Sequence, residues 1–161
     1  MVHFARPKGT GVCAVMFRGS APAKIDDKGR LKVPTGFRRS LEDRFGRDVF
    51  LTSVVGDSVL LYPLKTWEAF EERLAALPSM DRTKRRYLER VSYYGQQGQL
   101  DGQGRVLVPQ ILRASADMAG EVIVSGRLDH LEVWSHERLQ SRFDEQPFTD
   151  DDFQYLSDRG V

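Results

Sequence analysis

The segment IDDKGRLKVPTGFR, residues 25–38, recurs without a gap as LDGQGRVLVPQILR, residues 100–113. The identical pairs are Asp26 and Asp101, Gly29 and Gly104, Arg30 and Arg105, Val33 and Val108, Pro34 and Pro109, and Arg38 and Arg113. Each copy is followed by a short helical pattern that ends at a glycine, and then by two apolar runs. In a chain of 161 residues, this repeat predicts a duplicated unit with the order strand, strand, helix, strand, strand.

Local chemistry accounts for the elements of the first unit. The residues RLKV at positions 30–33 alternate polar and apolar side chains, as a half-buried strand does. Gly29 can adopt positive φ in the preceding turn, and the Asp26 carboxylate can accept hydrogen bonds from the amides of that turn. Apolar side chains at every fourth position of residues 37–45 predict a helix that ends at Gly46.

Further segments connect and flank the two units. Apolar runs on either side of the turn residues GDS predict a hairpin over residues 49–62, and a helix is expected to start near Asp81. The segment GQQGQLDGQG, residues 95–104, is rich in glycine and glutamine and is expected to form a loop. Ser135 is a candidate N-cap of a later helix, whereas the acidic end beyond Pro147 is expected to be loose.

These patterns divide the chain into five segments. The predicted boundaries are a disordered leader at residues 1–15, a first repeat at 20–66, connecting helices at 67–94, a second repeat at 95–138, and a C-terminal helix with an acidic tail at 139–161. Two starting points remain open, since Met1 and Met16 could each be the first residue in the cell. Trp67 and Trp134 each follow an apolar run and are predicted to pack in the core or at an interface.

Composition and charge are those of a globular protein with an uneven charge distribution. Hydrophobic residues make up 40% of the chain, charged residues make up 29%, and the net charge is +1. Residues 16–40 hold seven basic and two acidic side chains, whereas residues 137–161 hold three basic and seven acidic ones. This asymmetry indicates a basic working end and an acidic tail. No run approaches the roughly 20 apolar residues that span a bilayer, and Cys13 is the only cysteine, so we expect a soluble, cytoplasmic protein without membrane contact.

No group of residues has the spacing of a catalytic or metal site. The segment GTG at residues 9–11 lacks the ending of a phosphate-binding loop, and no serine lies in a G-x-S-x-G elbow. His3, His130 and His136 lack the spacing of metal ligands. We therefore predict no enzyme activity, no catalytic residue, no bound metal and no cofactor.

Five segments of the chain resemble the MraZ family. They are MFRG at Met16, DDKGRLKVP, VLLYPLKTWE, DGQGRVLVP and LEVW. The resemblance implies a mainly β fold with short helices, in which two AbrB-like pseudo-repeats of one chain form a duplicated swapped-hairpin, or double-split, β-barrel. It also implies a sequence-specific bacterial DNA-binding transcription regulator in the cytoplasm and nucleoid. Such a regulator would act as a ring-like homo-oligomer on repeated promoter sites ahead of its division and cell-wall gene cluster.

The resemblance and the charge pattern of the first copy together predict which residues contact double-stranded DNA. Arg30 and Arg105 match the arginines of the two D-x-x-x-R motifs, and an arginine fork suits phosphate oxygens or the O6 and N7 of guanine. The predicted DNA-binding residues are Arg30, Lys28, Lys32, Lys24 and Arg105, and the predicted turn residues are Asp26, Gly29, Asp101 and Gly104. The four predicted DNA-binding residues of the first copy all have even numbers, so where the chain is extended their side chains lie on one face. The first copy is expected to be the stronger contact, because Gln103 and Leu107 replace its two motif lysines in the second.

A second function class stays open beside the DNA-binding regulator. An antitoxin-like protein-interaction module of the same fold could wrap a protein partner with its acidic tail. The intact second motif and the helical pattern after Trp134 favour the regulator, because such modules are usually short single-copy chains. The basic run at residues 82–90 fits contact with DNA, with another subunit or with solvent equally well.

Overall fold

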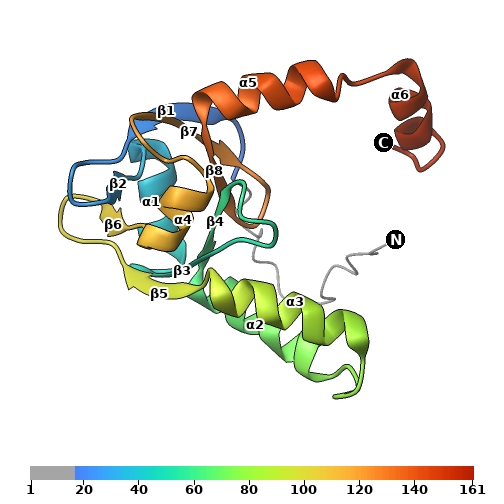
Figure 1. Cartoon of the computed structure of the whole chain (residues 1–161), viewed down its shortest axis with the longest axis horizontal. Coiled ribbons are helices and arrows are strands. Elements are labelled where there is room, and N and C mark those ends of the chain that lie inside the picture. The colour runs from blue at the N-terminus through green and yellow to red at the C-terminus, as the bar shows by residue number, and fades with distance from the viewer. Residues whose placement is uncertain (1–16) are drawn as a thin grey trace.

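The computed structural model describes residues 17–161, in which short helices surround two antiparallel sheets (Figure 1). The first repeat and the connector contain β1 (Ser20–Lys24), β2 (Arg30–Lys32), α1 (Thr35–Arg44), β3 (Asp48–Thr52), β4 (Val59–Pro63), α2 (Leu64–Ala75) and α3 (Arg82–Tyr93). The second repeat and the C-terminal region contain β5 (Gln96–Gln99), β6 (Arg105–Leu107), α4 (Gln110–Ser115), β7 (Glu121–Gly126), β8 (Leu131–Ser135), α5 (His136–Glu145) and α6 (Asp150–Ser157). Both repeats have the predicted order of elements, so the duplication inferred from the sequence is confirmed.

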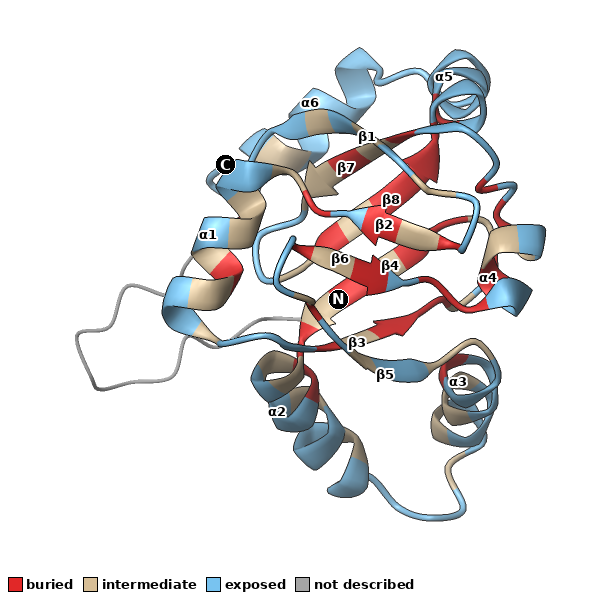
Figure 2. Cartoon of the chain, turned by 90° about the vertical axis from the view of Figure 1, so that its left-hand side faces the viewer, coloured by how far each residue is buried: buried red, intermediate tan, exposed pale blue. Residues whose placement is uncertain are grey.

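The strands of the two repeats are interleaved in one six-stranded sheet. Its order is β1-β7-β8-β4-β3-β5, and every neighbouring pair is antiparallel. The first strand of each repeat therefore pairs with the third strand of the other repeat. No described pairing joins the edge strands β1 and β5, so the sheet is open. Strands β2 and β6 form a separate two-stranded ribbon, which lies across one face of the sheet between α1 and α4 (Figure 2).

One hydrophobic core joins the ribbon to the sheet. Leu31 and Val106 enter it from the ribbon, and Leu51 and Val124 enter it from the sheet. All four side chains are at most 2% exposed, and burying an aliphatic side chain of this size stabilises a fold by about 1.5–3 kcal/mol. The apolar alternation of each short ribbon strand thus decides which of its faces points outward.

The loop expected at residues 95–104 is wrong in its first half, because Gln96–Gln99 form β5. Strand β5 pairs with β3 along its whole length, with Gln99 opposite Asp48. A Cβ atom at Gly98 would lie 3.1 Å from Val106 Cγ2, so the missing side chain lets β5 pack closely against the ribbon. Glycine and glutamine have little preference for strands, and the pairing with β3 therefore creates this strand.

Helix ends follow the local signals in the sequence. Asp81 caps α3 by accepting a hydrogen bond from the Lys84 amide at 2.8 Å. Ser135 caps α5 by accepting one from the Arg138 amide at 3.4 Å. Gly46 follows α1 with a φ of +85°, as a glycine beyond a helix end commonly does. These three predictions are confirmed.

The acidic end beyond Pro147 is not loose, contrary to expectation, because residues 150–157 form α6. Thr149 accepts a hydrogen bond from the Asp152 amide at 3.3 Å, and Asp152 accepts one from the Thr149 amide at 2.9 Å. This capping box places three aspartates in the first turn, where negative charge suits the helix dipole. The acidic run is therefore the start of a helix.

Three further expectations concern the leader, the membrane and the two tryptophans. The leader predicted at residues 1–15 lies outside the described part of the chain. Within residues 17–161, no helix combines the length and the apolar character that crossing a membrane requires. Trp67 and Trp134 are buried as predicted, and the Trp67 ring stacks on Phe50 with 4.8 Å between centroids.

Candidate nucleic-acid interface

The outer face of the β2–β6 ribbon carries three cations and one leucine. The register places Arg30 opposite Leu107, and Lys32 opposite Arg105. Between these pairs, Leu31 and Val106 point into the core, so the four flanking side chains share the opposite face. Lys32 and Leu107 are exposed, and the two arginines are partly exposed. We call this four-residue surface the ribbon face.

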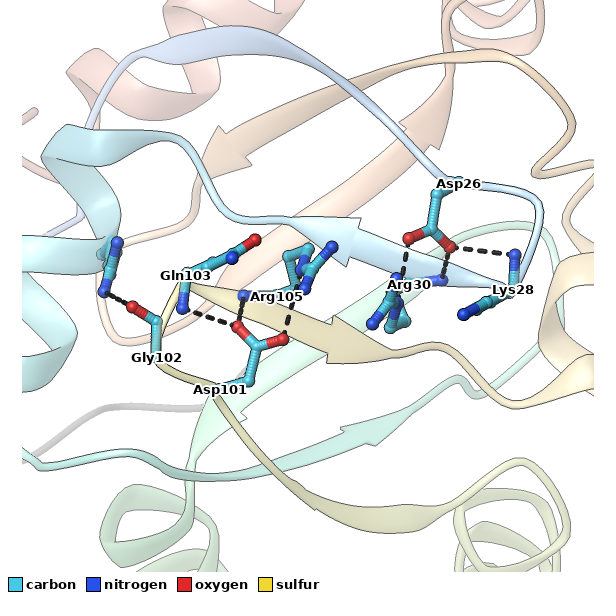
Figure 3. A network of polar contacts seen from close by, with 8 residues as sticks. Asp26, Lys28, Arg30, Asp101, Gly102, Gln103 and Arg105 are labelled. Carbon is cyan, nitrogen blue, oxygen red and sulfur yellow. Dashed lines mark hydrogen bonds and ion pairs between the residues drawn. The ribbon is translucent and has the colours of Figure 1, made fainter.

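The first motif copy forms a turn around the carboxylate of Asp26 (Figure 3). Asp26 Oδ1 accepts hydrogen bonds from the Lys28 amide at 3.0 Å and from the Arg30 amide at 2.8 Å. Its Oδ2 accepts one from Arg30 Nε at 2.9 Å. The pKa of Asp26 is lowered, chiefly by the hydrogen bond from the Arg30 amide and further by the Arg30 side chain and its charge. The aspartate therefore braces the turn and holds the arginine by one nitrogen.

The second motif copy repeats this geometry. Asp101 Oδ1 accepts hydrogen bonds from the Gln103 amide at 2.8 Å and from the Arg105 amide at 2.9 Å, and its Oδ2 accepts one from Arg105 Nε at 3.1 Å. The amide of Arg105 is again the largest cause of the lowered pKa of Asp101. In both copies the terminal nitrogens of the motif arginine form no hydrogen bond or ion pair with residues 17–161, so they can donate to a ligand (Figure 3).

Each turn is also tied to the opposite repeat through its glycine. Gly29 and Gly104 have φ of +83° and +73°, a conformation that favours glycine. The Gly29 carbonyl accepts a hydrogen bond from the Val108 amide, and the Gly104 carbonyl accepts one from the Val33 amide, both at 2.9 Å. The two turns thus lie at opposite ends of the ribbon, and each is fixed by the strand of the other repeat.

Two arginines outside the D-x-x-x-R motifs also pack against the turn of the opposite repeat. A Cβ atom on Gly29 would lie 2.5 Å from Arg113 Cζ, and one on Gly104 would lie 2.5 Å from Arg38 Cδ. Arg38 Nη2 also donates to the Gly102 carbonyl at 3.0 Å. Arg38 and Arg113 are one of the identical pairs of the repeat, so the sequence marks them as a matched pair. Their spacing in the sequence, however, does not indicate that they contact the turn glycines.

The other two lysines predicted to bind DNA, Lys28 and Lys24, do not lie on the ribbon face. Lys28 is exposed in the first turn, beside the ribbon. Lys24 lies in β1, where it is opposite Glu121 in the six-stranded sheet. The shared parity does not put Lys24 on the ribbon face, because the turn at residues 26–29 separates β1 from β2.

The matches with known proteins cover both repeats. A family model described as "MraZ protein, putative antitoxin-like" matches residues 16–90 and 95–157. The chain belongs to the MraZ family. The MraZ family resemblance found in the sequence is therefore confirmed.

Curated relatives carry the name Transcriptional regulator MraZ. That of Koribacter versatilis is 48% identical over 147 residues, which cover 91% of this chain and 100% of the relative. That of Acidobacterium capsulatum is 44% identical over 146 residues, which cover 91% and 100%. That of Escherichia coli strain K12 is 36% identical over 149 residues, which cover 89% and 98%. The MraZ match thus includes both motif turns and the whole ribbon.

Proposed function

We propose that this chain is a sequence-specific DNA-binding transcription regulator that contacts double-stranded DNA with the ribbon face. The observation that carries the proposal is the register of β2 and β6, which gathers Arg30, Lys32 and Arg105 on one exposed surface. A two-stranded ribbon fits the major groove of DNA, where base edges can be distinguished. The name of the curated relatives supports regulation of transcription.

The two motif arginines are proposed to read bases. Each is held at Nε by its aspartate, which leaves the terminal nitrogens free for the O6 and N7 of a guanine. Arg30 and Arg105 are diagonal neighbours on the ribbon, and such neighbours are about 7–8 Å apart. Since bases rise by about 3.4 Å per step along one strand, the two arginines would reach bases about two steps apart.

The lysines are proposed to contact phosphates. Lys32 lies on the ribbon face, and Lys28 is exposed in the adjoining turn, so both surround the arginines with positive charge. Lys24, on β1, would contact the backbone only at the margin of the surface. The aspartates would act through the arginines, because a carboxylate beside a phosphate is repelled.

We further propose that the interleaving of the repeats is the swapped-hairpin, double-split arrangement of AbrB-like folds, made within one chain. The support is the exchange of first strands between repeats, β1 onto β7 and β5 onto β3. On the family resemblance, the chain would assemble into ring-like homo-oligomers in the cytoplasm and nucleoid. It would bind repeated sites in the promoter of its own division and cell-wall gene cluster, and it would have no catalytic activity.

A binding measurement tests the DNA proposal. Fluorescence anisotropy would compare labelled duplex from the region upstream of the protein's own gene with a shuffled duplex of equal composition. We expect tighter binding to the upstream duplex and a steep loss of affinity as salt rises, because cations of the ribbon face displace counterions from DNA. Equal affinity for both duplexes would overturn sequence-specific reading, and absence of binding would favour the antitoxin-like alternative.

A further inference from the structure

Residues 143–161, here called the C-terminal arm, expose aromatic side chains that contact only one another or other residues of the arm in part and stay largely exposed. Phe143, Phe148, Phe153 and Tyr155 are each more than half exposed. Single exposed apolar residues are common on protein surfaces, but large apolar side chains gathered in one short segment mark an interaction site. The arm also holds six acidic residues and one arginine.

The end of the arm is a defined helix, yet within residues 17–161 no side chain of α6 is buried. The Phe148 and Phe153 rings contact each other with 4.8 Å between centroids, which adds a hydrophobic staple to the capping box. Of the eight residues of α6, only Leu156 is partly buried. Isolated helices shorter than about 12–15 residues are marginal in water, so tertiary or intermolecular packing is needed to hold α6.

The surface that complements the arm lies elsewhere on the molecule. The α2–α3 hairpin has an apolar tip at Leu77 and Met80, the latter 79% exposed. Helix α3 carries five basic residues and one acidic residue. By helical spacing, Arg82, Arg86 and Tyr93 share one exposed face of α3, and neither arginine forms an ion pair with residues 17–161.

The arm does not meet the hairpin of its own chain. Helix α5 leads away from the sheet and carries α6 at its far end, whereas α2 and α3 project from the opposite end of the molecule in both views (Figures 1 and 2). An anionic aromatic segment and a cationic apolar hairpin on separate ends of one chain can meet only between two copies.

We propose that the C-terminal arm of one copy docks on the α2–α3 hairpin of a second copy. Aromatic side chains of the arm would cover the apolar tip of the hairpin, and its aspartates would pair with the α3 arginines. Because two different surfaces meet, the contact is head-to-tail, and repeated contacts close into a ring or extend as a filament. This inference rests on the oligomer part of the proposed function and leaves the ribbon face free for DNA.

Charge reversal tests the contact without touching the ribbon. Arg82→Glu with Arg86→Glu changes the hairpin, and Asp150→Lys with Asp151→Lys changes the arm but keeps the Asp152 capping box. We expect each pair to reduce the assembly at micromolar concentration, down to the 18.3 kDa monomer, and the four changes together to restore it. Arg39→Glu with Asp43→Lys, at two exposed residues of α1, is the control for charge reversal away from both surfaces, and it should assemble like the parent.

The readouts are the mass by light scattering and the thermal melting of each variant, and they separate the possible outcomes. A monomeric parent protein would overturn the proposal. An assembly that resists both charge reversals, or a four-change variant that fails to assemble although it folds, would also overturn it. Loss of assembly on changing the arm but not the hairpin would place the arm on another surface and refute this docking site. DNA affinity of the same variants, measured with a duplex holding one site, tests the ribbon separately, so failure of either proposal is distinguishable.

Discussion

Replacing either motif arginine by alanine should weaken DNA binding while the fold remains intact. In Arg30→Ala, Asp26 keeps its hydrogen bonds from the amides of residues 28 and 30, so the turn survives. The lost ion pair is partly exposed and screened by solvent, so its removal should change stability little. A bidentate contact with guanine contributes about 1–3 kcal/mol, which corresponds to a roughly 5–150-fold loss of affinity per contact.

The ribbon register changes what is expected of Arg105→Ala. Sequence alone predicts the milder effect there, since the second copy lacks the motif lysines. In the structure, however, Lys32 of the first copy lies directly opposite Arg105, whereas Leu107 lies opposite Arg30. The positive charge next to Arg105 is therefore no smaller than that next to Arg30. We expect the two variants to lose affinity for DNA to a similar extent, within about threefold of each other.

Anisotropy on the upstream and shuffled duplexes, with assembly and thermal melting checked, measures both variants. Lys65→Ala removes the same charge from an exposed site on α2 and serves as the control. If the arginines read bases, the loss should fall mainly on the upstream duplex; if they contact phosphate, both duplexes should weaken evenly and the salt slope should become shallower. Parent-like affinity in both arginine variants would refute the ribbon as the reading element.

Three further outcomes follow from the same geometry. Lys32→Leu should lower the steepness of log K against log salt by about 0.9 per lost phosphate contact, and Leu107→Lys should raise it. Binding titrations over a range of salt concentrations check both variants. Unchanged slopes would place the lysine away from the DNA backbone. Gly29→Ala should reduce stability by about 1–2 kcal/mol in urea denaturation, because its φ is +83°, whereas Gly36→Ala within α1 should stabilise by roughly 0.5–1 kcal/mol. Since the pKa of Asp26 is lowered below its ordinary 3.8, the contribution of its carboxylate to folding stability is full above that value and is lost as the pH falls through the lowered pKa. The stability difference between the parent and Asp26→Asn should therefore shrink below about pH 4. A difference that does not change with pH would contradict the role of Asp26 in bracing the turn.

The sequence by itself determined the features that depend on neighbours along the chain. The duplicated unit, the turn glycines and the helix caps at Asp81 and Ser135 all arise within a few residues. The hydrogen bonds of Asp26 with its motif arginine also span only four residues. Such local interactions can be anticipated from residue type and spacing.

Tertiary structure alone decided the features that join distant residues. The glutamine-rich β5 exists because β3 supplies its hydrogen-bonding partner, and no local preference indicates it. Lys24 lies apart from the ribbon face, and Lys32 lies beside Arg105, because pairing between repeats sets the register. Arg38 and its counterpart act on the turn of the opposite repeat for the same reason. One short segment cannot reveal which distant strand will complete its hydrogen bonds, and in this chain those pairings build the surface proposed to bind DNA.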